Sequence, residues 1–170
     1  MVSDRFTLGH VKTMEQDQPI LRQADPSDIG AVAALTEQAY AVYTQLLGAP
    51  PIPVTEDYGP RIEAGQVWLL EISGKLAGLI VLERHADHIL IFSVAVAPEF
   101  QGKKLGVRLL DWAETKAGEA ELDLVKLYTN ARMERNIALY SAYGYRETGR
   151  RANPKRPGWT VVDMEKRLAR

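Results

Sequence analysis

The chain has 170 residues, a length typical of one domain that buries roughly 70% of its unfolded surface. Hydrophobic residues make up 46% and charged residues 25%, which argues against a disordered, collagen-like or coiled-coil protein. The absence of cysteine excludes disulfide scaffolds, thiolate metal sites and cysteine nucleophiles. Residues 1–10 lack the apolar core of a signal peptide, and the longest apolar stretch, residues 89–97, is too short to span a membrane. We therefore expect a cytoplasmic protein with no membrane association.

The formal net charge of −1 conceals an uneven distribution. Residues 1–98 carry 6 basic against 12 acidic side chains, a net charge of −6, whereas residues 99–170 carry 15 against 10, a net charge of +5. The basic residues are dispersed and lack the interleaved aromatic residues of a nucleic-acid surface, so we expect no nucleic-acid partner. An anionic small molecule suits the basic half better, although charge alone does not distinguish this from chance.

The first part of the chain predicts an extension, a strand and a long helix. Residues 1–19 are polar and aperiodic and predict an N-terminal extension, while residues 20–170 predict a single domain. A short strand is expected at residues 20–24. Residues 25–28, Asp-Pro-Ser-Asp, offer a capping acid, a proline at the first helical position and an acid in the first turn. We expect a helix to begin there and to end near Leu47.

A proline-rich segment follows the long helix. Four prolines within residues 48–60 predict a fixed, mostly irregular loop that leads to a short helix at residues 56–64. Because loops carry much of the substrate contact in enzymes, we expect this loop to form a wall of the substrate site.

Three strands are predicted next. Residues 66–73 and 76–84 form a hairpin with a tight turn at residues 74–75. A second turn at residues 85–87 leads to a strand at residues 88–96, whose continuous apolar run indicates burial on both faces. This strand is expected at the centre of the sheet.

The second half alternates helices and strands. Helices are expected at residues 104–118 and 132–143, with a strand at residues 124–129 between them. Two closing strands are expected at residues 145–151 and 159–166, and these strands can also pair between two chains in a homodimer. The elements together predict an α/β (α+β) fold with a mixed sheet of about seven strands and about four helices.

The most informative segment is residues 93–110, SVAVAPEFQGKKLGVRLL. A buried strand leads into a turn and a helix, and the free N–H groups and positive dipole at the start of the helix favour an anion. Gly102 and Gly106 let a phosphate approach the backbone, and Lys103 and Lys104 add positive charge. Taken alone, glycines before a helix more often indicate only a turn.

The same segment resembles the Q/R-x-x-G-x-G/A signature of the GNAT N-acetyltransferases, a loop that binds the pyrophosphate of acetyl-coenzyme A. Gln101 and Gly106 match the first and last positions, whereas Lys104 replaces the middle glycine. The predicted order of elements is also that of the family over residues 20–168. The resemblance implies a GNAT fold with a splayed central strand pair, and acetyl-CoA as co-substrate. It implies cofactor contacts from Val94, Ala95, Val96, Gln101, Gly102, Lys103, Lys104, Leu105 and Gly106.

A second segment, residues 136–145, NIALYSAYGY, resembles the family helix whose tyrosine lies near the thioester sulfur. That tyrosine is Tyr140, and Asn136 lies one turn before it on the same helix face. The resemblance implies Asn130 or Asn136 as a polar cofactor contact, although Met133 stands where many relatives place an asparagine. A helical tyrosine by itself is more often a core residue. With the motif, Tyr140 is implied as the general acid that protonates the departing CoA thiolate.

The general base is less evident. Leu90 stands where relatives of the histone-modifying type have a glutamate. Glu83 and His88, on neighbouring strands, are the candidates to accept the proton of the amine through water, as is Glu71, but a charge at a strand end is more often structural. His85 and His88 flank a predicted turn, and we expect no metal site.

Three functions are compatible with these patterns. The first is an N-acetyltransferase acting on a primary amine of a small molecule or peptide. The second is a non-catalytic acyl-CoA-binding module, motivated by Leu90 and Met133. The third, a nucleotide-binding protein, requires G-x-x-x-x-G-K-[ST] or G-x-G-x-x-G, and the sequence contains neither. The acceptor is expected to contact residues 48–60 and 152–159 and an aromatic set comprising Tyr40, Tyr43, Tyr58 and Trp68.

Overall fold

The computed structural model describes residues 18–169, so residues 1–17 of the predicted extension lie outside the described part. Its strands are β1 (Ile20–Gln23), β2 (Val67–Ile72), β3 (Lys75–Arg84), β4 (Ile89–Val96), β5 (Leu124–Asn130), β6 (Arg146–Ala152) and β7 (Thr160–Arg167). Its α-helices are α2 (Ile29–Leu47), α3 (Ile52–Thr55), α4 (Tyr58–Glu63), α5 (Leu105–Glu119) and α6 (Glu134–Ala142).

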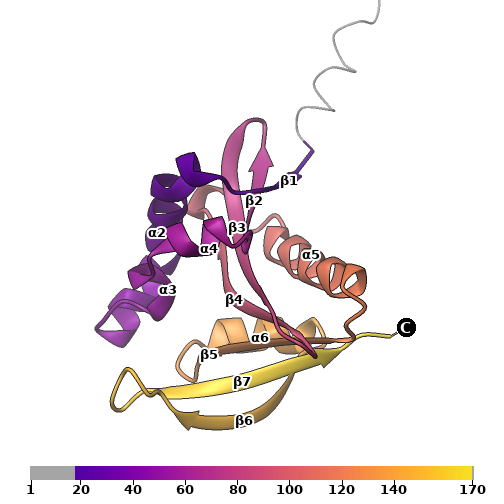
Figure 1. Ribbon diagram of the computed structural model, residues 1–170. Helices are drawn as coiled ribbons and strands as arrows, with labels where there is room; N and C mark the ends of the chain where they lie inside the picture. The colour runs from indigo at the N-terminus through magenta and orange to yellow at the C-terminus, as the bar shows by residue number, and fades with distance from the viewer. Residues whose placement is uncertain (1–17, 170) are drawn as a thin grey trace, which may run out of the picture.

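One mixed sheet organises the fold (Figure 1). Within residues 18–169 it has seven strands in the order β1-β2-β3-β4-β5-β7-β6. All neighbouring strands are antiparallel except β4 and β5, which are parallel. The mixed seven-stranded sheet confirms the predicted fold class, and the five helices exceed the expected four because the proline-rich segment contributes two short ones.

The start of the long helix follows the prediction from its capping residues. Asp25 accepts the N–H of Ser27, and Asp28 accepts the N–H of Asp25, which forms a capping box on a 3-10 turn that leads into α2. Arg22 donates to both carboxylate oxygens of Asp28, at 2.8 and 2.9 Å. These hydrogen bonds hold the pKa of Asp28 below its ordinary value.

The proline-rich segment is more regular than predicted. It contains the four-residue helix α3, because Pro51 precedes that helix and Pro53 lies in its first turn, where proline is tolerated. The predicted short helix is α4, which Asp57 caps. The buried hydroxyl of Tyr58 donates to the carbonyl of Pro53 at 2.6 Å and ties α4 to α3.

The predicted hairpin forms with its turn one residue earlier than expected. Ser73 and Gly74 occupy the turn between β2 and β3, with φ of 51° and 75°. A two-residue turn of this type needs positive φ at both central positions. Of the two residues, only Gly74 is of a type that predicts this conformation from the sequence. β4 then takes the central place that its apolar run predicted.

β4 and β5 separate partway along their length, as Figure 1 shows. Residues 89–91 pair with residues 125–127, and the pairing ends there. At the same point Phe92 is an extra residue in β4, since Val81 of β3 pairs with the residue after Phe92 and Leu82 with the residue before it. A bulge bends its strand, so β4 turns away from β5, and the predicted splayed strand pair is confirmed.

Helices cover both faces of the sheet (Figure 1). Leu109 and Leu110 of α5 are buried against one face, and Val32 and Leu35 of α2 are buried against the other. Gly78 of β3 allows α5 its close approach, because a Cβ there would lie 3.2 Å from the Leu109 side chain and 3.0 Å from a carbonyl of β4. The two faces therefore hold two hydrophobic clusters around the central strands.

No helix between residues 18 and 169 combines the length and apolar character needed to cross a membrane. β6 lies at the edge of the sheet, and its residues are mostly exposed. A cytoplasmic location and a homodimer stay predictions.

Candidate active site

A cavity lies where β4 and β5 diverge. The space there measures about 660 Å³ together with the open solvent at its mouth. The diverging strands supply Val94 and Tyr128, α2 and the segment after it supply Tyr40 and Ile52, and α6 and the β6–β7 loop supply Tyr140 and Trp159. Residues far apart in the chain thus converge on one site at the centre of the sheet.

The backbone of β4 presents N–H and C=O groups to this region that pair with no neighbouring strand. The N–H of Ala97 donates to the carbonyl of Ala77 at 2.8 Å, and antiparallel pairs alternate between bonded and non-bonded positions. The N–H and C=O groups of Val94 and Val96 therefore point away from β3 and toward β5, which no longer pairs with them. Ala95 faces the other way, because the same alternation turns its backbone to β3 and its side chain is buried with α2, and its contact with the cofactor stays a prediction.

Two tyrosines attach α2 to the site. The hydroxyl of Tyr40 donates to the carbonyl of Val94 at 3.2 Å and lies 3.3 Å from Ser93 Oγ. Burial raises the pKa of Tyr40 above its ordinary value. The hydroxyl of Tyr43 donates to Asn136 Oδ1 at 2.8 Å, which joins α2 to α6. Of these two, Tyr40 lines the cavity.

Tyr140 lies on α6 and lines the cavity. Only 9% of the residue is exposed, and no group within residues 18–169 hydrogen-bonds its hydroxyl. Burial raises the pKa of Tyr140 well above its ordinary value, and the neighbouring tyrosines add to this effect. The phenol therefore stays protonated at neutral pH, with its proton available to a ligand in the cavity.

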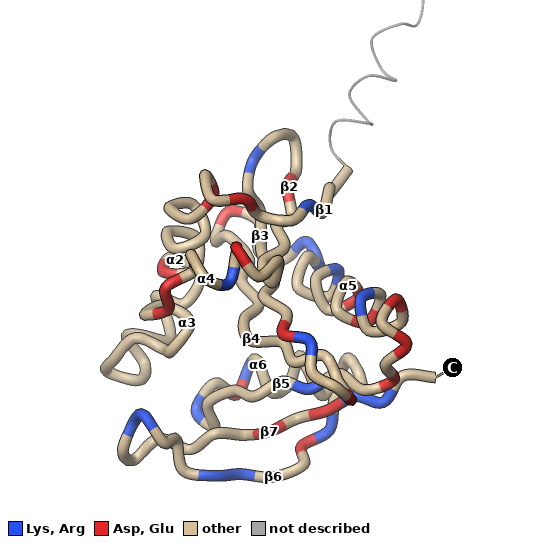
Figure 2. The backbone as a smooth tube through the Cα atoms, viewed as in Figure 1, with Lys and Arg blue, Asp and Glu red and all other residues tan. Residues whose placement is uncertain are grey.

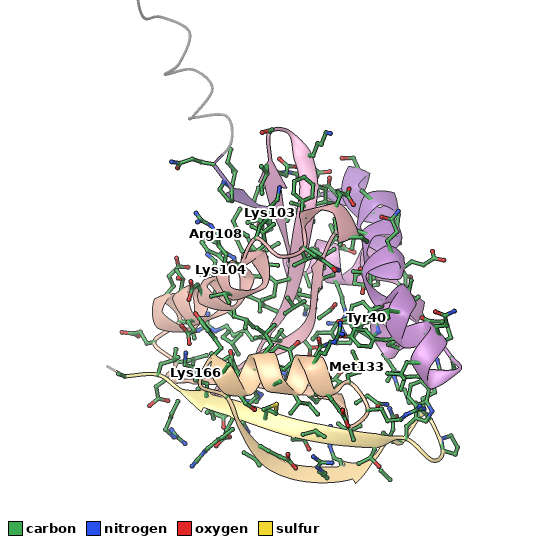
Figure 3. All side chains as sticks on the ribbon, turned by 180° about the vertical axis from the view of Figure 1, so that it is seen from behind. Tyr40, Lys103, Lys104, Arg108, Met133 and Lys166 are labelled. Atoms are coloured by element: carbon green, nitrogen blue, oxygen red, sulfur yellow. The ribbon has the colours of Figure 1, made fainter. Side chains whose placement is uncertain are left out.

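The two predicted asparagines also line the cavity, but each already uses its side-chain oxygen. Asn130 Oδ1 accepts the N–H of Arg132 at 2.9 Å, and Asn136 Oδ1 accepts the Tyr43 hydroxyl. The amide NH₂ groups are thus the parts left to contact a ligand. Met133, buried at the start of α6, lies in the same cavity wall, and Figure 3 shows it close to Tyr40.

The predicted phosphate loop turns the chain into α5. Gly102 and Lys104 have φ of 81° and 59°, in the left-handed region that favours glycine. Lys104 is the N-cap residue and its side chain makes no capping bond, so the first N–H groups of α5 are left for a ligand. Lys103, Lys104 and Arg108 lie together at this end of α5 (Figure 3), and none has an acidic partner in the described part of the chain.

The rest of the loop has mixed exposure. Gln101 and Gly106 are at the surface of the turn, and a Cβ on Gly106 would only meet Leu139 at 3.9 Å. Leu105, the first residue of α5, has its side chain buried in the core, so only its backbone can contact a ligand. The loop does not line the cavity but lies beyond the end of β4, where a long ligand would continue.

The structure does not bring the predicted bases into the cavity. Glu83 accepts a hydrogen bond from Arg61 at 3.0 Å, and the nearest ring nitrogen of His85 lies 3.5 Å from its other oxygen. His88 Nδ1 lies 2.6 Å from Asp87 at the turn before β4. Among the described residues that line the cavity, none is acidic, basic or histidine.

Sequence analysis missed two aromatic residues of the cavity. Phe92 is the bulge residue of β4, and no sequence pattern announces a bulge. Tyr128 is a partly polar residue near the end of β5, and this departure from the apolar pattern of the strand is the one sequence feature that indicates its place in the cavity. Burial raises the pKa of Tyr128, and the charge of Glu83 adds to this effect.

Besides Tyr43, the expected pocket residues Trp68 and Tyr58 lie outside the cavity. Trp68 packs edge-on against Trp112 of α5, with ring centroids 5.2 Å apart. Tyr58 is buried between α4 and α3. Both serve the packing of helices, which is the common role of large aromatic residues.

Some cations of the basic half are paired with acids. Figure 2 shows Lys and Arg along β6 and the loop before β7. Arg150 lies 2.6 Å from Glu147, and Arg151 lies 2.8 Å from Asp163. The cations at the start of α5 have no such partner among residues 18–169.

Comparison with known proteins identifies the family. The model of the acetyltransferase (GNAT) family matches residues 32–145. The aminoalkylphosphonate N-acetyltransferase of Salmonella typhimurium is 33% identical over 82 residues. That alignment covers 45% of this chain and 53% of the relative, so the chain spans about half the length of the curated relative it matches.

Solved structures share the fold. The ribosomal-protein-S18-alanine N-acetyltransferase of Escherichia coli has a TM-score of 0.70 at 20% identity, over 90% of this chain and 96% of that one. PaiA N-acetyltransferase of Thermoplasma acidophilum, in complex with coenzyme A, has a TM-score of 0.71 at 17% identity. The match covers 89% of this chain and 99% of that one. The family match spans most of the described domain, and the chain belongs to the GNAT family of acetyltransferases.

Proposed function

We propose that this GNAT acetyltransferase moves the acetyl group of its co-substrate, acetyl-CoA, to a primary amine of a small molecule or peptide, with Tyr140 as general acid. The observation that carries the proposal is the Tyr140 hydroxyl, which lines the cavity between β4 and β5 and has no hydrogen-bond partner among residues 18–169. The names of the similar proteins support an amine acceptor of either class, since one names an aminoalkylphosphonate and the other a protein alanine.

The residues present fit acetyl-CoA. Val94 and Val96 turn backbone donors and acceptors toward β5, so the amides of pantetheine can pair with them as an added strand would. The free N–H groups of α5, with Lys103, Lys104 and Arg108, suit the phosphates at the other end. Acetyl-CoA supplies a thioester, whose acyl carbon would lie in the cavity near Tyr140.

Transfer requires one bond to form, one bond to break and two proton movements. The amine nitrogen bonds to the acyl carbon, the carbon–sulfur bond breaks, and Tyr140 donates its proton to the sulfur. Burial keeps Tyr140 protonated at neutral pH, which is the form that a general acid needs. In the proposed mechanism an N–H group of β4 near Val94 polarises the acyl carbonyl, since the Val94 N–H is not bonded to β3.

The amine must lose a proton as it reacts. We propose Glu83 as the base, acting through water, because its charge helps to raise the pKa of Tyr128 in the cavity wall. His88 is bonded to Asp87 at a hairpin turn and does not line the cavity, so the proposal favours Glu83 over His88. The distance that water must bridge makes this a weaker form of base catalysis than direct contact.

A thiol-release assay tests the proposal. The protein is mixed with acetyl-CoA and a panel of primary amines, and free CoA is measured over time. Amine-dependent release at enzymic rates supports the proposal. Tight binding of acetyl-CoA with heat stabilisation, but without turnover on any amine, would instead identify a non-catalytic acyl-CoA-binding module.

A further inference from the structure

We infer that the acceptor is a primary amine carried on an apolar body, such as an arylalkyl group, without an anionic group. The inference rests on the proposed function and concerns the acceptor half of the same cavity. It follows from three features, which are the uncharged lining, the neutral character of the polar groups left free in it, and the arginines that flank its aromatic walls.

The cavity offers an apolar wall to whatever enters beside Tyr140. Pro51, Ile52 and Pro53 line it from the segment after α2, and Trp159 and Val161 line it from the β6–β7 loop and β7. No acidic, basic or histidine side chain of the described residues lines it. A second charge on the acceptor, beyond the reacting amine, would be removed from water without an opposite charge, and that is strongly unfavourable.

Several side-chain oxygens of the wall are already bonded within the protein. Asn153 Oδ1 accepts the N–H of Lys155 at 2.9 Å, and Asn130 Oδ1 accepts the N–H of Arg132 at 2.9 Å. Ser93 Oγ lies 3.3 Å from the Tyr40 hydroxyl. The polar groups left for a ligand are neutral, among them amide NH₂ groups and the Tyr140 hydroxyl, so none of them brings an opposite charge to an anionic group.

Arginines stack on the aromatic walls without entering the cavity. The guanidinium of Arg61 lies 3.6 Å from the centroid of the Phe92 ring, and that of Arg151 lies 5.8 Å from the Tyr128 ring. Neither arginine lines the cavity. Their charges are matched by acids, since Arg61 lies 2.9 Å from Glu56 and Arg151 pairs with Asp163. The arginines therefore fix the rings as walls and do not serve as an anion site.

A third arginine fixes the cavity wall on the side of Trp159. Arg156 donates to the carbonyl of Pro50 at 3.0 Å, which connects the β6–β7 loop to the segment after α2. Its guanidinium lies 5.3 Å from the centroid of the Trp159 ring. The bridge spans the two segments that supply the apolar wall, so the wall is preorganised for a rigid apolar group.

The competing arrangement is an anionic acceptor held by Arg156, which has no acidic partner among residues 18–169. The curated relative is named for an aminoalkylphosphonate, an acceptor of that kind. We favour the apolar acceptor because Arg156 is already bonded to Pro50 and does not line the cavity. The two arrangements predict opposite preferences between amines that differ by one anionic group.

Matched amines distinguish the two. The kcat/KM is measured with saturating acetyl-CoA for 2-phenylethylamine, for phenylalanine, which adds a carboxylate to the same skeleton, and for 2-aminoethylphosphonate. We expect 2-phenylethylamine to exceed both by about 100-fold or more, because the anionic group would remain unpaired. Equal or higher kcat/KM for either anionic amine would overturn the inference.

Binding measurements keep this test separate from catalysis. Calorimetry on the protein saturated with CoA gives the affinity for each amine even without turnover. If CoA binds and 2-phenylethylamine binds at least tenfold more tightly than phenylalanine, the inference holds even where no thiol is released and the proposed function fails. If phenylalanine or the phosphonate binds more tightly, the inference fails whether or not acetyl transfer occurs.

The variant Trp159→Ala tests the wall itself. We expect kcat/KM for 2-phenylethylamine to fall about tenfold through a higher KM, while the value for methylamine changes less than threefold, since methylamine is too small to need the wall. The affinity for CoA serves as the control for folding and should not change. An equal fall for both amines would contradict a role of Trp159 in selecting the apolar body.

Discussion

The rings of Tyr140 and Tyr145 pack edge to face with centroids 6.1 Å apart, but their hydroxyl groups have different surroundings. Tyr140 lines the cavity, whereas the Tyr145 hydroxyl is fully buried and has no hydrogen-bond partner. Burial raises the pKa of both phenols. Two neighbouring buried tyrosines thus differ in access to a ligand, which makes one the test residue and the other its control.

The variant Tyr140→Phe removes the proposed proton donor and little else. We expect kcat to fall about 100-fold, because general acid catalysis typically contributes that much or more. The affinity for acetyl-CoA should be retained, since the ring remains. The matched variant Tyr145→Phe removes a hydroxyl that has no hydrogen-bond partner, so its activity and stability should equal or exceed those of the parent. Steady-state kinetics decide, and a kcat of Tyr140→Phe within threefold of the parent rules out the acid role.

The variant Glu83→Gln tests base catalysis through water. Arg61 keeps its contact with Glu56, so the variant should fold. We expect kcat/KM at pH 7 to fall about tenfold, and the difference to shrink as the pH rises past the pKa of the amine, since the substrate then arrives neutral. The control His88→Gln should follow the parent at every pH. A pH–rate profile of Glu83→Gln that matches the parent would remove Glu83 from the mechanism.

Lys104 combines a strained backbone with a charge at the phosphate loop, and two variants separate these effects. Lys104→Ala removes the charge and keeps a side chain at φ of 59°, whereas Lys104→Gly relieves the strain as well. We expect Lys104→Gly to be about 1 kcal/mol more stable than Lys104→Ala, by urea denaturation, because left-handed backbone favours glycine. Both variants should bind CoA several-fold more weakly than the parent in low salt, as calorimetry will show. Equal stability of the two variants would contradict the strain at this position.

The Asp28 carboxylate gives stability a defined pH dependence. Its pKa lies below the ordinary value of 3.8 because Arg22 donates to it. Its contribution is therefore complete above that value and is lost as the pH falls through the native pKa. We expect Asp28→Asn to lower the free energy of unfolding by about 1–2 kcal/mol at pH 7 and by less at pH 3.

Urea denaturation at the two pH values measures this contribution. The control Asp111→Asn, on the exposed surface of α5, should change stability little at either pH. A loss in Asp28→Asn that is the same at pH 7 and pH 3 would show that the carboxylate charge is not the stabilising element.

Much of the fold was predictable because local signals agreed with the tertiary structure. Asp25 and Asp28 mark the start of the long helix through a capping box that needs no distant partner. The apolar run of β4 indicated a central strand, and the loop from Gln101 to Gly106 indicated the helix that follows. Each of these depends on residues close in sequence.

The remaining features depend on contacts between distant residues. The bulge at Phe92 is defined only by the pairing of β4 with β3, so the sequence alone did not indicate it. The Tyr43 hydroxyl reaches Asn136, which lies 93 residues further along the chain. The Glu83 carboxylate is paired with Arg61, and no periodicity in the sequence reveals such a pair. For the same reason the sequence identified the cofactor side of the site better than the acceptor side.

The central claim is that the backbone of β4 and the start of α5 hold acetyl-CoA with its acyl group beside Tyr140. A crystal structure of the protein with bound CoA tests this most directly. We expect the diphosphate at the N–H groups of Leu105 and Gly106, the pantetheine amides paired with Val94 and Val96, and the sulfur within hydrogen-bond distance of the Tyr140 hydroxyl. A CoA molecule bound elsewhere, or a sulfur atom remote from Tyr140, would contradict it.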